Sequence, residues 1–107
     1  MNPETLIEVA ACKKVLDELG VFGIKLTSPG TKGMPDRMFL IPGGKCLLIE
    51  FKDTGKEPEP LQTYTHNLLR QLGYNIEVHD NVIDAFNAVR KALHASQVSD
   101  ESDQVPT

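Results

Sequence analysis

The segment that most constrains the fold is the run from Cys46 to Lys52, which is almost continuously apolar until its charged end. A strand covered on both faces has this pattern, whereas a strand with one solvated face alternates. We therefore expect a central strand with other layers packed on both sides. Glu50 and Lys52 are two residues apart, so their side chains project from the same face of that strand.

Further helices and strands are predicted around this segment. A first helix should begin after the N-cap Asn2, with Pro3 in its first turn, and end at Gly20. Periodicity predicts further strands at 22–27, 38–41 and 74–78, and further helices at 60–72 and 82–93. Because a crossover helix joins parallel strands, the fourth strand should lie parallel to the third. The expected fold class is α/β, as a mixed α+β sheet: a four-stranded sheet flanked by helices, in the order αβββαβα.

The spacing of apolar residues predicts which faces are buried. Phe22, Ile24 and Leu26 alternate with small or polar residues, which is typical of a strand with one buried face. The crossover helix carries an apolar stripe expected to face the core, formed by Leu61, Tyr64, Thr65, Leu68, Leu69 and Leu72. Glu8 falls within the apolar arc of the first helix. An inward carboxylate needs a partner, either a basic residue such as Lys25 or a metal ion.

Length and composition predict one modest domain. The chain has 107 residues, 40% of them hydrophobic. It contains no run approaching the roughly 18 apolar residues of a membrane helix, and residues 1–4 do not begin a signal peptide. Cys12 and Cys46 are isolated, which favours reduced thiols. We expect a cytoplasmic domain at 1–95, with no membrane partner and no organic cofactor, and a disordered acidic tail at 96–107.

The net charge of -4 does not exclude a nucleic-acid ligand. The acidic residues concentrate in the tail and at a candidate site, whereas between Gly20 and Arg70 the basic residues are slightly in excess. Any affinity for DNA should therefore depend strongly on salt and metal ions. The candidate DNA contacts are Lys25, Lys32, Arg37 and Lys56.

Asp36 and Glu50 indicate where chemistry could occur. They are fourteen residues apart, and a hairpin turning at Pro42-Gly43-Gly44 would bring Asp36 beside the Glu50 end of the central strand. Two carboxylates, the Phe51 carbonyl and water molecules would suit the octahedral shell of Mg²⁺. Lys52 could orient the attacking water or stabilise developing negative charge, and Glu8 could join the inner or outer metal shell. This set of groups suits phosphodiester hydrolysis.

Each part of this pattern has a simpler explanation. An acid and a lysine two residues apart often form a minor salt bridge on a solvated strand. Gly33 to Asp36 could be an ordinary turn, and Glu8 could simply pair with Lys25. The histidines do not add a metal site, because His66, His79 and His94 lack metal-ligand spacing.

Three short runs, together with Glu8, carry a family resemblance: Gly33-Met34-Pro35-Asp36-Arg37, Leu48-Ile49-Glu50-Phe51-Lys52 and Leu61-Gln62. They resemble the VRR-NUC branch of the PD-(D/E)XK nuclease superfamily, and the resemblance spans roughly Leu6 to Leu93. It implies a restriction-endonuclease-like core, which agrees with the periodicity. It also implies that Asp36 and Glu50 bind Mg²⁺ or Mn²⁺, that Lys52 is catalytic, and that Glu8 and Gln62 lie at the same site.

The resemblance also suggests a substrate class. Standalone members of the family resemble homodimeric, Holliday-junction-resolving endonucleases of phages and bacteria, so we expect a homodimer acting on branched DNA in the cytoplasm of a bacterium or a phage-infected host. A two-fold dimer would set two sites against two strands of a symmetric junction. A flap or nicking endonuclease and a non-catalytic DNA-binding or protein-interaction module are the alternatives.

Overall fold

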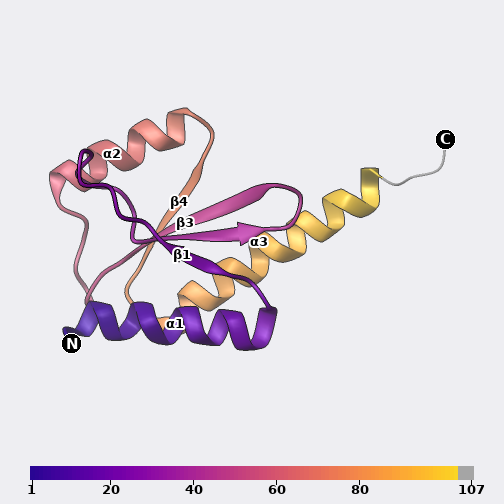
Figure 1. Ribbon diagram of the computed structural model, residues 1–107, viewed down its shortest axis with the longest axis horizontal. Helices are drawn as coiled ribbons and strands as arrows, with labels where there is room; N and C mark the ends of the chain where they lie inside the picture. Colours follow the sequence, from indigo (N-terminus) through magenta and orange to yellow (C-terminus); the bar gives the residue numbers. More distant parts are fainter. Residues whose placement is uncertain (104–107) are drawn as a thin grey trace.

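A computed structural model of the chain describes residues 1–103, with side chains described as far as residue 98. The elements follow the predicted order of helix, three strands, helix, strand and helix (Figure 1). Their bounds are α1 Pro3–Leu19, β1 Gly23–Lys25, β2 Arg37–Ile41, β3 Lys45–Phe51, α2 Pro60–Gln71, β4 Asn75–His79 and α3 Val82–Asp103.

The strands form one mixed sheet in the order β1-β2-β3-β4. β1 and β3 both pair with β2 in the antiparallel sense, and β3 pairs with β4 in parallel, as α2 crosses over between them. The β2–β3 hairpin aligns Arg37 with Ile49 and Ile41 with Lys45. Its turn contains Gly43 and Gly44 at φ 86° and 74°, a region that glycine adopts without steric cost. The mixed sheet and the central position of β3 confirm the predicted architecture.

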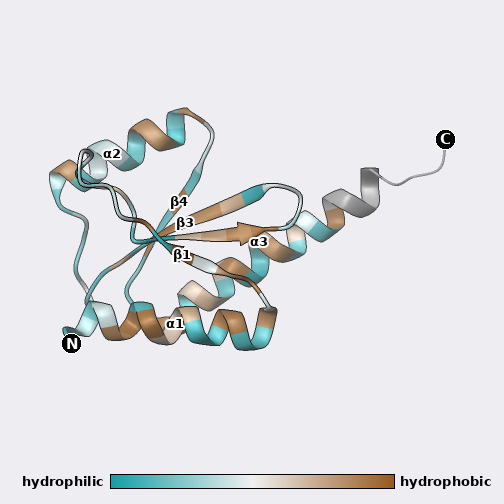
Figure 2. Cartoon of the chain, viewed as in Figure 1, coloured by the Kyte–Doolittle hydropathy of each residue, from teal (hydrophilic) through white to brown (hydrophobic). Residues whose placement is uncertain are grey.

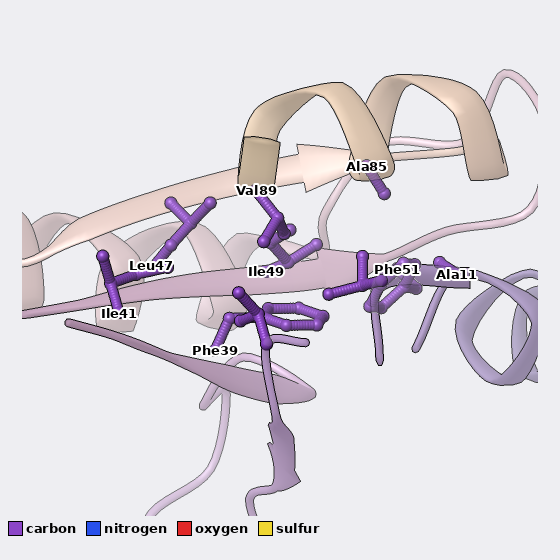
Figure 3. Packing of buried hydrophobic residues seen from close by; sticks show 10 residues of the cluster. Ala11, Phe39, Ile41, Leu47, Ile49, Phe51, Ala85 and Val89 are labelled. Carbon is purple, nitrogen blue, oxygen red and sulfur yellow. The ribbon is translucent and has the colours of Figure 1, made fainter. Parts of the chain in front are cut away.

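Helices α1 and α3 pack together on one face of the sheet, and α2 lies on the other side (Figure 1). The core lies beneath α1 and α3, where Phe39, Ile49 and Phe51 meet Ala85 and Val89 (Figure 3). Since alternate residues of β3 face opposite ways, Glu50 and Lys52 lie on the α2 side, away from this core. The two faces of β3 thus differ: one packs into the hydrophobic core, and the other carries Glu50 and Lys52.

The prediction that β1 has one buried face is wrong. Phe22 is 58% exposed and Ile24 is 36% exposed. β1 is a three-residue edge strand whose extensive packing is against β2, while α1 and α3 cover the centre of the sheet. Alternating apolar residues on such a short edge strand stay largely exposed, because α1 and α3 do not cover it.

The predicted inward stripe of α2 is also largely wrong. Thr65 and His66 are buried, whereas most of the larger apolar residues, which appear as brown segments of α2 in Figure 2, are exposed. The exposed members are Leu61, Tyr64, Leu68 and Leu72. The rotation of α2 agrees with its contacts to the loop before β2: Thr65 Oγ1 donates to the Lys32 carbonyl at 2.8 Å, and Gly33 packs directly on the helix.

The end of the fold lies beyond residue 95. α3 continues to Asp103, and the buried Ser96 donates its hydroxyl to the Pro42 carbonyl at 2.6 Å. The expectation of a disordered tail is therefore corrected for residues 96–103, while residues 104–107 of that tail lie outside the described residues. Within residues 1–103, no helix combines the length and the apolar character needed to cross a membrane.

Candidate active site

The hairpin places Asp36 beside the end of β3, as predicted. Asp36 immediately precedes β2, and its Oδ2 accepts a hydrogen bond of 2.8 Å from the backbone N–H of Phe51. The backbone of Asp36 is also held from the other side, because its carbonyl accepts from the Leu26 N–H at 2.9 Å. The main-chain N–H groups of Leu26 and Phe51 thus fix the position of Asp36.

Glu50 is the buried acid of the site. Its side chain is 4% exposed, and its Oε2 lies 2.9 Å from Gln62 Nε2 and 3.5 Å from Lys52 Nζ. Gln62 is at the start of α2, where its Oε1 accepts from the Glu59 N–H at 2.9 Å in a capping box. The capping interaction orients the amide so that its N–H points at Glu50. The structure therefore brings Glu50, Lys52 and Gln62 together.

The electrostatic environment raises the pKa of both acids. Burial raises the pKa of Glu50 to about 7, the nearby Asp36 carboxylate adds to this shift, and Lys52 and Gln62 oppose it. Burial also raises the pKa of Asp36, although the Phe51 N–H and the Lys25 ammonium oppose that shift. A carboxylate whose ionised form is disfavoured by burial and by a second nearby carboxylate is common in catalytic and metal-binding sites.

The remaining oxygen of Glu50 tests whether a cation would fit. Glu50 Oε1 is buried and has no hydrogen-bond partner among the described side chains and backbone. A buried carboxylate oxygen without a partner is costly, and a hard divalent cation would satisfy it. No group of three or more His, Cys, Asp or Glu side chains within the described residues has a metal-binding arrangement. Asp36 and Glu50 alone would thus leave most of the coordination shell of such a cation to water.

Glu8 is engaged by two basic residues. It is buried on α1, its two oxygens lie 3.1 and 2.8 Å from Lys25 Nζ, and its Oε2 accepts from Arg37 Nε at 2.7 Å. Arg37 also donates from Nη1 to the Gly23 carbonyl at 3.1 Å. Lys25 Nζ lies 3.8 Å from Asp36 Oδ1, which links this cluster to the acid pair. The sequence-based alternative in which Glu8 pairs with Lys25 is thus present in the structure.

The other predicted residues lie around this centre. Phe51 contributes its N–H to Asp36, and its carbonyl remains a predicted ligand. Lys32 lies in the loop between β1 and β2, and Lys56 lies in the loop between β3 and α2; both are exposed. The structure therefore connects Glu8, Lys25, Asp36 and Arg37, and separately connects Glu50, Lys52 and Gln62, with Phe51 joining the two groups.

Sequence analysis set aside His66, which the structure places near the site. His66 lies four residues after Gln62 on α2, is 1% exposed, and its Nε2 has no hydrogen-bond partner among the described residues. Burial lowers the pKa of His66, with further contributions from Arg70 and Lys52. The four-residue spacing from Gln62 places both side chains on one face of the helix and could have predicted this position.

Comparisons with known proteins agree with the fold. The chain is 38% identical over 64 residues to "Putative nuclease p44" of Acyrthosiphon pisum secondary endosymbiont phage 1, a match that covers 60% of this chain and 69% of that protein. A solved structure described as a VRR_NUC domain superposes with a TM-score of 0.72 at 26% identity, covering 84% of this chain and 97% of the other. No family model matches the sequence.

Proposed function

Because the chain belongs to the VRR-NUC family of nucleases, we propose that it is a divalent-metal-dependent endonuclease that hydrolyses phosphodiester bonds in branched DNA. The observation that carries this proposal is the hydrogen bond that holds Asp36 against Phe51, the residue directly after Glu50, with the Lys52 ammonium beside Glu50. The proposed substrate is a four-way Holliday junction. A flap or nicked duplex is the alternative substrate for the same chemistry.

The proposed cofactor is Mg²⁺ or Mn²⁺. Asp36 and Glu50 would hold the ion, with the Phe51 carbonyl and Glu8 as the further predicted ligands. The support for this proposal is the buried, unpartnered Glu50 Oε1 and the raised pKa of both acids. When bound, such an ion neutralises charge on the phosphoryl group and makes a coordinated water more acidic.

Lys52 is the proposed catalytic lysine. Its side chain is only 11% exposed, and its ammonium lies beside Glu50. A largely desolvated ammonium stabilises negative charge on a phosphoryl oxygen more strongly than one in bulk water. Gln62 acts as a positioning residue in this proposal, since its bond to Glu50 Oε2 fixes that carboxylate while Oε1 remains available.

The proposed DNA contacts surround the open side of the site. The side chains of Lys25 and Asp36 are 49% and 27% exposed, whereas that of Glu50 is 4% exposed. A phosphate would therefore approach from the side of Lys25 and Asp36. Lys32 and Lys56 lie in the flanking loops, where they could contact neighbouring phosphates and position the strand without reading its sequence.

A homodimer forms part of the proposal because a symmetric junction presents two equivalent strands. Exposed apolar residues support an interface with a second copy. On α2 and its C-cap these are Leu61, Tyr64, Leu68 and Leu72, and at the β1–β2 edge they are Phe22, Ile24 and Leu40. Molar mass measured by light scattering over a range of concentrations tests the dimer, and a monomer at every concentration would argue against it.

A cleavage assay tests the activity. We would incubate the wild type and Glu50→Ala with Mg²⁺ or Mn²⁺ and with labelled four-way junctions, flaps, nicked duplexes and intact circular DNA. We expect metal-dependent internal cleavage by the wild type and a loss of at least about 100-fold in Glu50→Ala. Glu18→Ala serves as the control, because it removes an exposed acid from α1 whose partner is Lys14.

The assay also separates the alternatives. Preferential cleavage of four-way junctions supports a resolvase, whereas preferential cleavage of flaps or nicks supports the other substrate class. DNA binding without cleavage under any metal condition would favour a non-catalytic module. Cleavage by Glu50→Ala at the wild-type rate would contradict the proposed site.

A further inference from the structure

Lys25 occupies an unusual position between two acids of the candidate site. Its Nζ lies 2.8 and 3.1 Å from the two oxygens of Glu8 and 3.8 Å from Asp36 Oδ1. Strand pairing determines this placement, since Lys25 aligns with Arg37 and the next residue, Leu26, donates its N–H to the Asp36 carbonyl. An ammonium ion therefore already lies beside a carboxylate that the proposed metal would need.

The two basic residues of this cluster differ in how firmly they are held. Arg37 is 20% exposed in its side chain, donates to both Glu8 Oε2 and the Gly23 carbonyl, and would still neutralise Glu8 if Lys25 moved. The Lys25 side chain is 49% exposed and ends in a flexible chain of methylene groups. Among the described ion pairs, Lys25 provides the one that reaches Asp36.

A cation at Asp36 and an ammonium 3.8 Å from the same carboxylate would repel each other. Both positive charges compete for the same negative charge, and their repulsion grows in the partly desolvated environment around Glu50. Moving Lys25 toward solvent relieves this repulsion without breaking the Arg37–Glu8 pair. The exposed position of Lys25 allows such a movement, whereas the buried position of Lys52 does not.

We propose that Lys25 is an exchangeable counter-ion: it neutralises Asp36 and Glu8 in the metal-free protein, and a divalent cation displaces it from Asp36. The released ammonium is then free to contact a phosphate of the DNA strand. This inference rests on the proposed metal site. It also means that Lys25 weakens metal binding in the absence of DNA. A residue that only maintained the structure of the metal site would instead strengthen metal binding.

Calorimetric titration with Ca²⁺ in the absence of DNA tests this inference. Ca²⁺ takes oxygen ligands, and binding is measured here without any requirement for catalysis. Lys25→Gln removes the charge but keeps a donor for Glu8, and we expect it to bind Ca²⁺ about three- to tenfold more tightly than the wild type. Lys25→Arg keeps the charge and should remain within about twofold of the wild type.

Lys45→Gln is the matched control for net charge. Lys45 is exposed at the far end of β3, five residues before Glu50, which corresponds to about 17 Å along the strand. At physiological salt a charge at that distance is largely screened, so Ca²⁺ affinity should not change. Circular dichroism and thermal melting of each variant check that the fold is retained.

The outcomes are distinguishable. Tighter Ca²⁺ binding by Lys25→Gln alone supports the counter-ion role, and equal or weaker binding by Lys25→Gln overturns it while leaving the metal site intact. Equal tightening in Lys25→Gln and Lys45→Gln would reflect net charge and would also overturn the inference. If neither the wild type nor any variant binds Ca²⁺, both the inference and the proposed metal site are contradicted.

Discussion

The carboxylate of Asp36 accepts a hydrogen bond of 2.8 Å from the backbone N–H of Phe51, the residue directly after Glu50. This contact joins the start of β2 to the end of β3 and sets two acids side by side in a position that depends on the backbone. The backbone of the hairpin therefore determines the relative position of the two acids. Substitutions of side chains around Asp36 and Glu50 should change the pKa values and ligand affinity of these acids while the fold is retained.

The stability of the metal-free protein should depend on the ionisation of Glu50. Its folded-state pKa of about 7 exceeds the ordinary value of 4.5, so between these values the folded state binds more protons than the unfolded state. The contribution of Glu50 is therefore fully present below pH 4.5 and is lost as the pH rises through 7. We expect up to about 3 kcal/mol of unfolding free energy to be lost over this window. Asp36, whose pKa is also raised, contributes in the same direction.

Urea unfolding in EDTA, measured at intervals from pH 4.5 to 7.5, checks this prediction. Glu50→Gln should show a flatter pH profile, because the amide does not titrate. A wild-type stability that is constant or rises across the window, with Glu50→Gln parallel to it, would contradict the assigned pKa shift.

Metal affinity should rise with pH over the same range. A carboxylate must lose its proton to bind a cation, so the raised pKa of Glu50 makes protons compete with the metal below pH 7. We expect Ca²⁺ affinity to increase by about fivefold between pH 6 and pH 7 and to change little above pH 8. Calorimetry at constant ionic strength measures this dependence, and proton uptake or release inferred from buffers of different ionisation enthalpy provides an independent check.

Gln62 should be more important for cleavage than its exposed neighbours. Its Nε2 donates to Glu50 Oε2, so Gln62→Ala frees the carboxylate and should lower kcat about 10- to 100-fold. Gln62→Glu should be at least as harmful, since a carboxylate does not donate to Glu50 and would raise its pKa further. Thr63→Ala, next to it on the exposed side of α2, is the control. Wild-type kcat in Gln62→Ala would remove this positioning role.

Gly33 should tolerate no side chain. It has φ of 85°, and a Cβ at this position would lie 2.7 Å from Thr65 Oγ1 and 2.8 Å from the Leu61 carbonyl. Gly33→Ala should therefore lower the unfolding free energy by about 1–3 kcal/mol and disturb the contact between α2 and the loop before Asp36. Gly30→Ala, in the same loop, meets nothing within 4 Å and should have little effect. Chemical denaturation of the two variants measures the difference, and equal stabilities would contradict the close packing.

Ser96 should stabilise the fold although it lies beyond residue 95, where the sequence predicted the domain to end. Its buried hydroxyl donates to the Pro42 carbonyl at 2.6 Å and connects α3 to the β2–β3 turn. Ser96→Ala should cost about 1–2 kcal/mol, because it leaves a carbonyl without its donor. Ser28→Ala, in an exposed loop, is the control. Thermal and urea unfolding measure both, and a neutral Ser96→Ala would argue against a structural role for this part of α3.

Local patterns in the sequence were sufficient to predict the order of helices and strands and the placement of Asp36 beside the Glu50 end of the third strand. The uninterrupted apolar run of β3, the hairpin at Pro42-Gly43-Gly44 and the two-residue spacing of Glu50 and Lys52 all depend on neighbours along the chain. For that reason the sequence predicted a four-stranded mixed sheet with Asp36 beside the end of β3, and the structure agrees.

Tertiary structure decided which surfaces are buried and which of the possible partners the charged groups find. The apolar stripe of α2 faces solvent because the helix turns Gln62, Thr65 and His66 toward the sheet and the loop before β2. Glu8 is bound by Lys25 and Arg37, and Ser96 by Pro42, across separations of 17, 29 and 54 residues. Periodicity defines the faces of a helix or strand, but its orientation and its long-range partners depend on packing between layers, which no local stretch of sequence specifies.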